Sequence, residues 1–180
     1  MILTGSAINE CVLNGDITIE PYNYENLNPN SYNFHLGDYV MVYKNEVLDP
    51  KVEQETERID IPDDGLVLYP NKLYLGYIKE RMGSEKYVPI INGRSSTGRL
   101  GLFVHITANL IDIGSINNWT LQMHATQPIR IYKDMSIGQV TFWKTYGEIN
   151  LYDGKYKGST GPMASQVWRD FAKDKENKLL

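Results

Sequence analysis

Residues 32–43 read YNFHLGDYVMVY, and this stretch decides the fold class. Polar and apolar residues alternate over 32–36, whereas residues 39–43 are mostly aromatic or β-branched. Both patterns are typical of β-strands. Gly37 and Asp38 separate the two runs, and such a pair is typical of a tight turn. We therefore expect two strands that pair as a hairpin.

Strand-forming runs of the same kind recur along most of the chain. Turn residues separate them, which indicates a β-sandwich or barrel-like fold instead of alternating β-α-β units. One helix is expected over residues 4–14, with Thr4 or Ser6 as its N-cap and Gly15 as a left-handed C-terminal cap. The further strands are expected at residues 17–20, 58–61, 66–69, 73–78, 88–92, 102–107, 119–125, 129–132 and 139–143.

Composition narrows the function classes. The chain has 180 residues, of which 42% are hydrophobic, and a formal net charge of −4 at pH 7. These values are typical of one globular domain with no strongly basic field for nucleic acid. Since no apolar run approaches the roughly 18 residues of a membrane span, and the start does not resemble a signal peptide, we expect a cytoplasmic protein.

The chain has a single cysteine, Cys11. One cysteine forms no intramolecular disulfide and no cysteine-rich zinc site, so any hydrolytic chemistry is expected to work without a zinc held by cysteines. Cys11 lies among Ile8, Val12 and Leu13, and we expect it to be a small core residue.

The densest polar cluster is residues 92–101, NGRSSTGRLG. Arg94 and Arg99 carry planar guanidinium groups that suit phosphate oxygens, and Ser95 or Ser96 can cap a short helix running to Leu100. The cluster is thus either a phosphate-binding loop or a polar turn with a surface helix. It is not a Walker loop, because the Gly-Lys-Ser/Thr ending is missing.

A carboxylate follows within residues 104–114, VHITANLIDIG. Asp112 stands between two isoleucines and precedes Gly114. It is either a general base in apolar surroundings or a cap for the turn, and the cap is the commoner role.

Taken together, these motifs resemble the dCTP deaminase branch of the dCTP deaminase/dUTPase superfamily. The similarity runs in order to about residue 171, which leaves 172–180 as a flexible tail after a single domain over 1–171. The matching segments are the start with residues 19–22, Ser31–Gly37, the Arg-Ser-Ser motif at 93–101, the Thr-Ala and Asp-x-Gly motif at 107–114, and residues 155–171.

The resemblance implies a distorted β-jelly-roll of the dUTPase type, with a short N-terminal helix and a short helix after the Arg-Ser-Ser motif. It implies a homotrimer with active sites between subunits that binds dCTP, dUTP or dTTP. Mg²⁺ would be bound through the triphosphate, with no direct protein ligand and no zinc. No nucleic acid and no membrane is implied as a partner, and the compartment would be the cytoplasm, or a host's cytoplasm for a viral protein.

Site residues follow from the same resemblance, position by position. The catalytic group would comprise Ser95, Arg99, Asp112 and Gln122. The nucleotide would contact Arg94, Ser95, Ser96, Arg99, Thr107, Ala108, Asp112, Thr120, Gln122, Gln139, Tyr152, Lys155 and Ser159.

The sequence departs from the family at Gln122, where the family has a glutamate that handles the protons of deamination. A glutamine cannot accept and return a proton, so deamination is expected to be impaired. Three interpretations remain open: an engineered change, a natural loss that leaves dUTP hydrolysis intact, or altered specificity with a relocated base. His124, two residues along the same strand face, is a candidate for that base, although a packing histidine is the commoner case.

Three functional hypotheses therefore remain. The first is an enzyme that deaminates dCTP to dUTP, hydrolyses dUTP to dUMP, or does both; hydrolysis of dUTP alone is a variant of it. The second is a regulator that binds deoxynucleotides without catalysis. The third is a structural β-domain with a chance polar turn.

Overall fold

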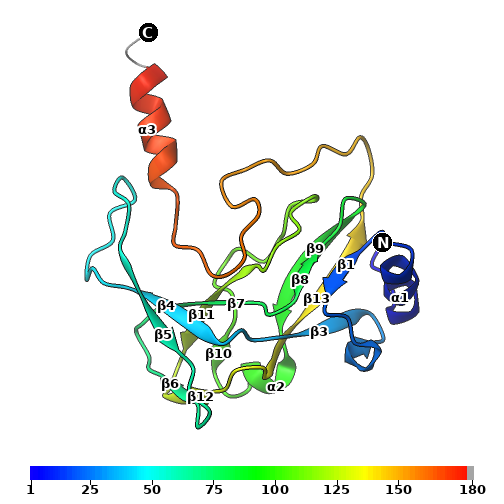
Figure 1. Ribbon diagram of the computed structural model, residues 1–180, viewed down its shortest axis with the longest axis horizontal. Helices are drawn as coiled ribbons and strands as arrows, with labels where there is room; N and C mark the ends of the chain where they lie inside the picture. The colour runs from blue at the N-terminus through cyan, green and yellow to red at the C-terminus, as the bar shows by residue number, and fades with distance from the viewer. Residues whose placement is uncertain (178–180) are drawn as a thin grey trace.

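The computed structural model describes residues 1–177 and is mainly β, as the sequence predicts (Figure 1). All strand pairs are antiparallel. One sheet consists of β2 (Leu27–Asn28), β3 (Ser31–His35), β13 (Ser136–Lys144) and β9 (Tyr87–Gly93), in that order. The other consists of β10 (Leu102–Phe103), β11 (Thr120–Ala125), β7 (Tyr74–Tyr77), β4 (Tyr39–Tyr43) and β5 (Thr56–Asp60).

Two smaller pairs complete the β structure, β1 (Thr18–Glu20) with β8 (Arg81–Gly83) and β12 (Ile129–Ile131) with β6 (Leu66–Leu68). Every predicted strand has a counterpart, although β10 covers only the first two residues of the stretch 102–107. The short strands β2 and β8 were not predicted, since runs of two or three residues show no periodicity.

The N-terminal helix α1 (Gly5–Leu13) is confirmed together with its caps. The Thr4 side chain accepts the Ala7 N–H at 3.4 Å, and Gly15 has a φ of 77°. Cys11 is half-buried on the face that packs against the core, and its Sγ lies 3.5 Å from the Tyr87 hydroxyl. The remaining helices are η1 (Tyr24–Asn26), α2 (Ser95–Gly98) and α3 (Trp168–Asn177).

Helix α3 extends away from the β structure (Figure 1). It includes residues 172–177, which the sequence analysis assigns to the tail; the last part of that tail, 178–180, lies outside the described residues. Among residues 1–177, no helix is long and apolar enough to span a membrane.

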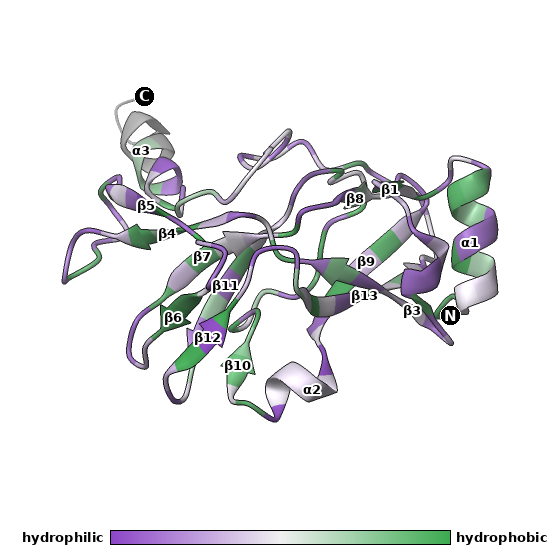
Figure 2. Cartoon of the chain, turned by 60° about the horizontal axis from the view of Figure 1, so that its bottom comes forward, coloured by the Kyte–Doolittle hydropathy of each residue, from purple (hydrophilic) through white to green (hydrophobic). Residues whose placement is uncertain are grey.

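The hydrophobic core lies between the sheets, so each strand buries one face in the core and leaves its other face outside it. Along β11, Leu121, Met123 and Ala125 are buried, whereas Thr120 and Gln122 point the other way and stay half-buried. Figure 2 shows hydrophobic and hydrophilic residues alternating along the strands. Because side chains alternate along a strand, burial of one set directs the other set to the opposite face.

The expected hairpin between β3 and β4 is wrong. Strand β3 pairs with β2 and β13, whereas β4 pairs with β5 and β7 in the other sheet. The chain changes sheets at Gly37, whose N–H donates to the Tyr77 carbonyl at 2.9 Å. The Gly-Asp pair does mark a sharp change of direction, but a local motif does not reveal the partners of the strands that it joins.

Gly37 leaves no room for a side chain, because a Cβ there would overlap the Tyr77 ring. The Tyr77 hydroxyl donates to Asp38 at 2.6 Å, which restrains the ring. Burial, with a smaller contribution from the Asp38 hydrogen bond, raises the pKa of Tyr77 to about 12. The ring therefore stays neutral at physiological pH and keeps donating to Asp38.

We predict that Gly37→Ala lowers the free energy of unfolding by about 1–3 kcal/mol, since the Tyr77 ring must move and leave Asp38. Denaturant unfolding measures this effect. Gly98→Ala is the matched control, because an ideal Cβ at Gly98 has nothing within 4 Å. Equal unfolding midpoints for the two variants would contradict the role of Gly37.

Candidate active site

A cavity of about 550 Å³ opens on the free face of β11. Its walls come from β11, from the loop 106–119 that precedes this strand, and from a C-terminal arm, which we define as residues 152–165. Seven of the predicted site residues line it: Thr107, Ala108, Asp112, Thr120, Gln122, Tyr152 and Ser159. The structure thus brings together residues from two separate stretches of the chain, 107–122 and 152–159.

Gln122 has a fixed orientation in this cavity. Its main-chain N–H donates to the Val104 carbonyl at 3.0 Å, and its side-chain Oε1 accepts the Ile106 N–H at 3.4 Å. Because a main-chain N–H can only donate, the amide oxygen must face Ile106. The amide NH₂ is therefore the end that remains for a ligand, and it can only donate.

Asp112 is exposed and, within residues 1–177, is the one acidic residue that lines the cavity. Its main-chain carbonyl, not its carboxylate, closes the turn by accepting the Ser115 N–H at 3.0 Å. Gly114 adopts a φ of 88° and sits where a Cβ would lie 2.9 Å from the Leu151 Cβ. The cap interpretation of the Asp112 side chain is thus wrong, because the main chain closes the turn and the exposed carboxylate makes no capping bond within residues 1–177.

The arm is attached to the other walls by hydrogen bonds. The Tyr152 N–H donates to the Ile113 carbonyl at 2.8 Å, and the Met163 N–H donates to Thr120 Oγ1 at 3.0 Å. Near its end, the Ser165 N–H donates to the hydroxyl of a β4 tyrosine at 2.9 Å. The cavity is consequently covered by a segment that reaches both β4 and β11.

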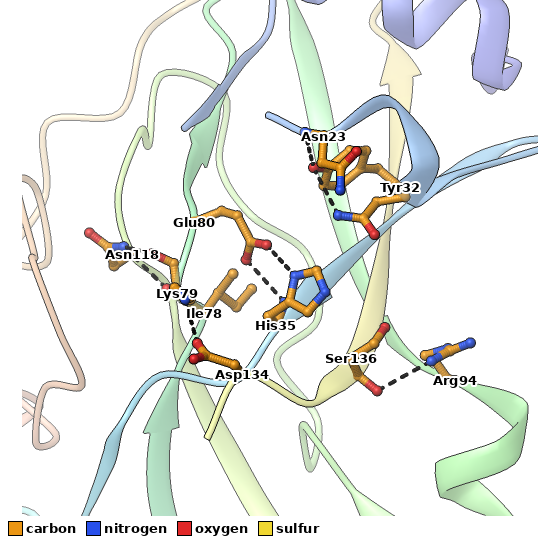
Figure 3. Close-up of polar contacts among 11 residues, drawn as sticks. Asn23, Tyr32, His35, Ile78, Lys79, Glu80, Arg94, Asn118, Asp134 and Ser136 are labelled. Atoms are coloured by element: carbon orange, nitrogen blue, oxygen red, sulfur yellow. Dashed lines mark hydrogen bonds and ion pairs between the residues drawn. The ribbon is translucent and has the colours of Figure 1, made fainter. Parts of the chain in front are cut away.

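The Arg-Ser-Ser motif lies outside this cavity. Its helix α2 begins after Arg94, which is the N-cap but makes no side-chain capping bond, and it ends at Gly98. The prediction of a serine cap and of a helix reaching Leu100 is therefore wrong. Arg94 Nη1 donates to the Ser136 carbonyl at 3.4 Å (Figure 3), and Arg94 and Ser95 line a second hollow of about 400 Å³.

Thr97 anchors α2 and was not identified from the sequence. It is 6% exposed, and its hydroxyl lies 2.8 Å from the Arg94 carbonyl and 3.3 Å from the Ile137 carbonyl. Ser95 and Ser96 of the same helix are exposed, as is Arg99, its C-cap. Since all three neighbouring hydroxyls look alike in sequence, only the packing of α2 on β13 distinguishes Thr97.

Three other candidates lie away from the cavity. Lys155 forms an ion pair with Asp170 of α3 and lines a separate hollow beside that helix. Gln139 faces the hydroxyl of Ser31, 3.0 Å away in the four-strand sheet. His124 packs beside the Phe103 ring, with centroids 6.3 Å apart. In this chain the packing interpretation of His124 therefore fits better than a relocated base.

Apart from Gln139 and Lys155, the predicted site residues thus form two groups within one chain, the cavity group and an α2 group of Arg94, Ser95, Ser96 and Arg99. Ile106 lines both hollows. Large apolar side chains near the two hollows are exposed: Leu100, Phe103, Ile106 and Leu110 are 55%, 53%, 55% and 61% exposed. Such patches mark contact surfaces in soluble proteins.

Chemically, the two groups are complementary. The cavity presents an amide NH₂, a carboxylate and tyrosine rings, which suit a heterocyclic base and a sugar. The α2 group presents two guanidinium groups and two hydroxyls, which suit phosphate oxygens. Among residues 1–177, no cluster of three or more histidine, cysteine or acidic side chains forms a ready metal site.

Comparisons with known proteins point to one family. The model of the dCTP deaminase-like family matches residues 2–145. A Clostridium botulinum protein named "dCTP deaminase, dUMP-forming" is 48% identical over 96% of this chain and all of its own length. A Hathewaya histolytica protein of the same name is 49% identical over 95% of this chain and 99% of its own length.

A solved structure shares the fold. The crystal structure of a 2'-deoxycytidine 5'-triphosphate deaminase from Agrobacterium tumefaciens superposes with a TM-score of 0.64 at 20% identity, covering 83% of this chain. This chain spans only 50% of the length of that protein.

We predict that Thr97→Val lowers the free energy of unfolding by about 1–3 kcal/mol, because two buried carbonyls lose their hydroxyl neighbour. Ser96→Ala, on the exposed side of α2, should change it by less than about 0.5 kcal/mol. Denaturant unfolding of the wild type, Thr97→Val and Ser96→Ala measures these differences in the free energy of unfolding. A Thr97→Val midpoint equal to that of Ser96→Ala would show that α2 is not held by this hydroxyl.

Proposed function

The chain belongs to the dCTP deaminase-like family, and from that premise we propose that it hydrolyses dUTP to dUMP and diphosphate and deaminates dCTP poorly. The observation that carries this proposal is Gln122, which stands in the cavity at the position of the family glutamate. Its relatives named "dCTP deaminase, dUMP-forming" support a deoxyuridine monophosphate as product.

Deamination at C4 of cytosine requires a group that takes a proton from water and delivers it to the ring and to the leaving ammonia. The Gln122 amide cannot do this, and its oxygen already accepts the Ile106 N–H. The remaining NH₂ donates, so it suits the O4 carbonyl of uracil and opposes the 4-amino group of cytosine, which is also a donor. Uracil is therefore the favoured base.

Hydrolysis of dUTP does not need the missing glutamate. A water attacks the α-phosphorus, the bond to the β-phosphate oxygen breaks, diphosphate leaves, and Asp112 accepts the proton of the water. Arg94 and Arg99 stabilise the phosphate charge through paired N–H groups, and the α2 serines donate to phosphate oxygens. Mg²⁺ bound to the triphosphate would supply further charge shielding, with Asp112 as its neighbouring carboxylate.

Each active site is proposed to form between two subunits of a homotrimer. Within one chain Arg94 and Ser95 of the α2 group line a different hollow from the cavity group, and Ile106, which is exposed, lines both. A neighbouring subunit would cover this apolar surface and place its α2 group over the cavity. Tyr152 and Lys155 from the arm would complete the site once Lys155 leaves Asp170.

We predict that the wild-type chain forms dUMP from dUTP but releases little ammonia from dCTP. Gln122→Glu should raise the release of ammonia from dCTP by about 10²-fold or more, because it restores a proton carrier. Product chromatography and an ammonia assay measure both. Gln122→Ala is the control, since it removes the amide without adding a base and should release no ammonia.

Two results would contradict the proposal. Equal ammonia release by the wild type and Gln122→Glu would show that residue 122 does not limit deamination. Binding of dUTP or dCTP without turnover of either would instead indicate a nucleotide-binding regulator.

A second prediction concerns assembly. Arg99→Ala and Asp112→Asn should each be inactive, yet mixed trimers should recover about a quarter of wild-type activity, because one in four sites then combines two intact groups. Arg99→Ala mixed with Ser95→Ala, whose defects lie in the same group, should recover none. Absence of recovery in the first mixture, with mixed trimers shown by mass, would place the whole site in one chain.

A further inference from the structure

The turn that leads into β11 contains an asparagine whose side chain is enclosed by other parts of the chain. Asn117 is 3% exposed. Its Nδ2 donates to Ser115 Oγ at 3.0 Å and to the Tyr156 carbonyl at 3.3 Å, and its Oδ1 accepts the Gly158 N–H at 2.8 Å. Both ends of this buried amide are therefore paired, and two of its three partners belong to the C-terminal arm.

The turn itself is firmly attached to the β structure. The main chain of Asn117 exchanges hydrogen bonds with Met82 of β8 in both directions, at 2.9 and 3.0 Å. The side chain of Asn118 donates to the carbonyls of Ile78 and Lys79 at 3.2 and 2.8 Å (Figure 3). Asn117 thus connects the arm to a part of the molecule that is held by several strands.

Residues 152–160 of the arm have little hydrophobic attachment of their own, since the buried residues of the arm, Gly161 and Pro162, come only after them. Across residues 143–160, all of which the structure describes, no residue is buried. Tyr152, Tyr156 and Ser159 nevertheless line the cavity, and the Asn118 N–H donates to the Ser159 carbonyl at 3.2 Å. Since conformational entropy opposes the ordering of an exposed segment, hydrogen bonds must hold this one in place.

We propose that Asn117 is a positioning residue that keeps residues 156–159 closed over the cavity before a ligand binds. If the arm is already ordered, ligand binding does not have to offset the entropy cost of ordering it. The Asn117 side chain therefore strengthens ligand binding more than it accelerates the chemical step. That the ligand is a pyrimidine deoxynucleotide rests on the proposed function, whereas the role of the amide rests on the contacts of Asn117 alone.

The test compares Asn117→Ala with Asn26→Ala. Asn26 also bonds through its side chain, donating to the Tyr32 hydroxyl at 3.3 Å, but it lies in η1 away from the cavity. In Asn117→Ala without nucleotide, we expect the amides of residues 152–160 to exchange hydrogen about tenfold faster, while those of β13 keep their rates. We expect the KM for dUTP to rise about tenfold with kcat changed less than about threefold.

Asn117→Asp is a second variant that keeps the test usable if Asn117→Ala does not fold. It keeps the acceptor for Gly158 but replaces the donor to the Tyr156 carbonyl by a second acceptor, so exchange over 152–160 should again be faster than in the wild type. Unchanged exchange over 152–160 in both Asn117 variants, or equal acceleration in β13 and in the arm, would overturn the proposal. If dUTP is not turned over, the proposed function fails, but hydrogen exchange still decides the role of Asn117.

Discussion

The segment from His35 to Gly37 is hydrogen-bonded along both of its edges, and the arrangement of the two sheets depends on it. On one edge, Leu36 exchanges hydrogen bonds with Asp134 and Met135, both at 3.0 Å. On the other, the His35 carbonyl accepts the Lys79 N–H and the Gly37 N–H donates to Tyr77, both at 2.9 Å. The end of β7 and the start of β13 are therefore held a fixed distance apart.

A buried carboxylate reinforces this junction. Glu80 is 3% exposed; one of its oxygens accepts the His35 N–H at 3.0 Å and the other contacts His35 Nδ1 (Figure 3). Hydrogen bonds extend from this junction in two directions. At the start of β13, the Ser136 carbonyl accepts from Arg94 Nη1, and beyond β7 the Lys79 carbonyl accepts from the Asn118 side chain. Both groups of candidate site residues are thus attached to one rigid connection, which fixes their positions relative to one another.

Features that depend on local pattern could be predicted from the sequence, and features that depend on distant partners could not. The strands and the caps of α1 follow from periodicity and from single residues such as Thr4 and Gly15. The partner of β3 does not, because Gly37 and Asp38 are equally compatible with a hairpin and with a change of sheet. The cavity residues were identified by resemblance, yet the roles of Thr97 and Asn117 arise only from burial, which no local motif records.

The junction at residues 35–37 also bears on how such a chain can change over evolutionary time. Most of its bonds join main-chain atoms, which every residue type supplies, so substitutions leave them intact; Gly37 is the exception. Besides the absence of a side chain at Gly37, the junction therefore needs only the buried Leu36 and the carboxylate of Glu80. The fold as a whole tolerates extensive substitution, since the Agrobacterium tumefaciens structure shares it at 20% identity.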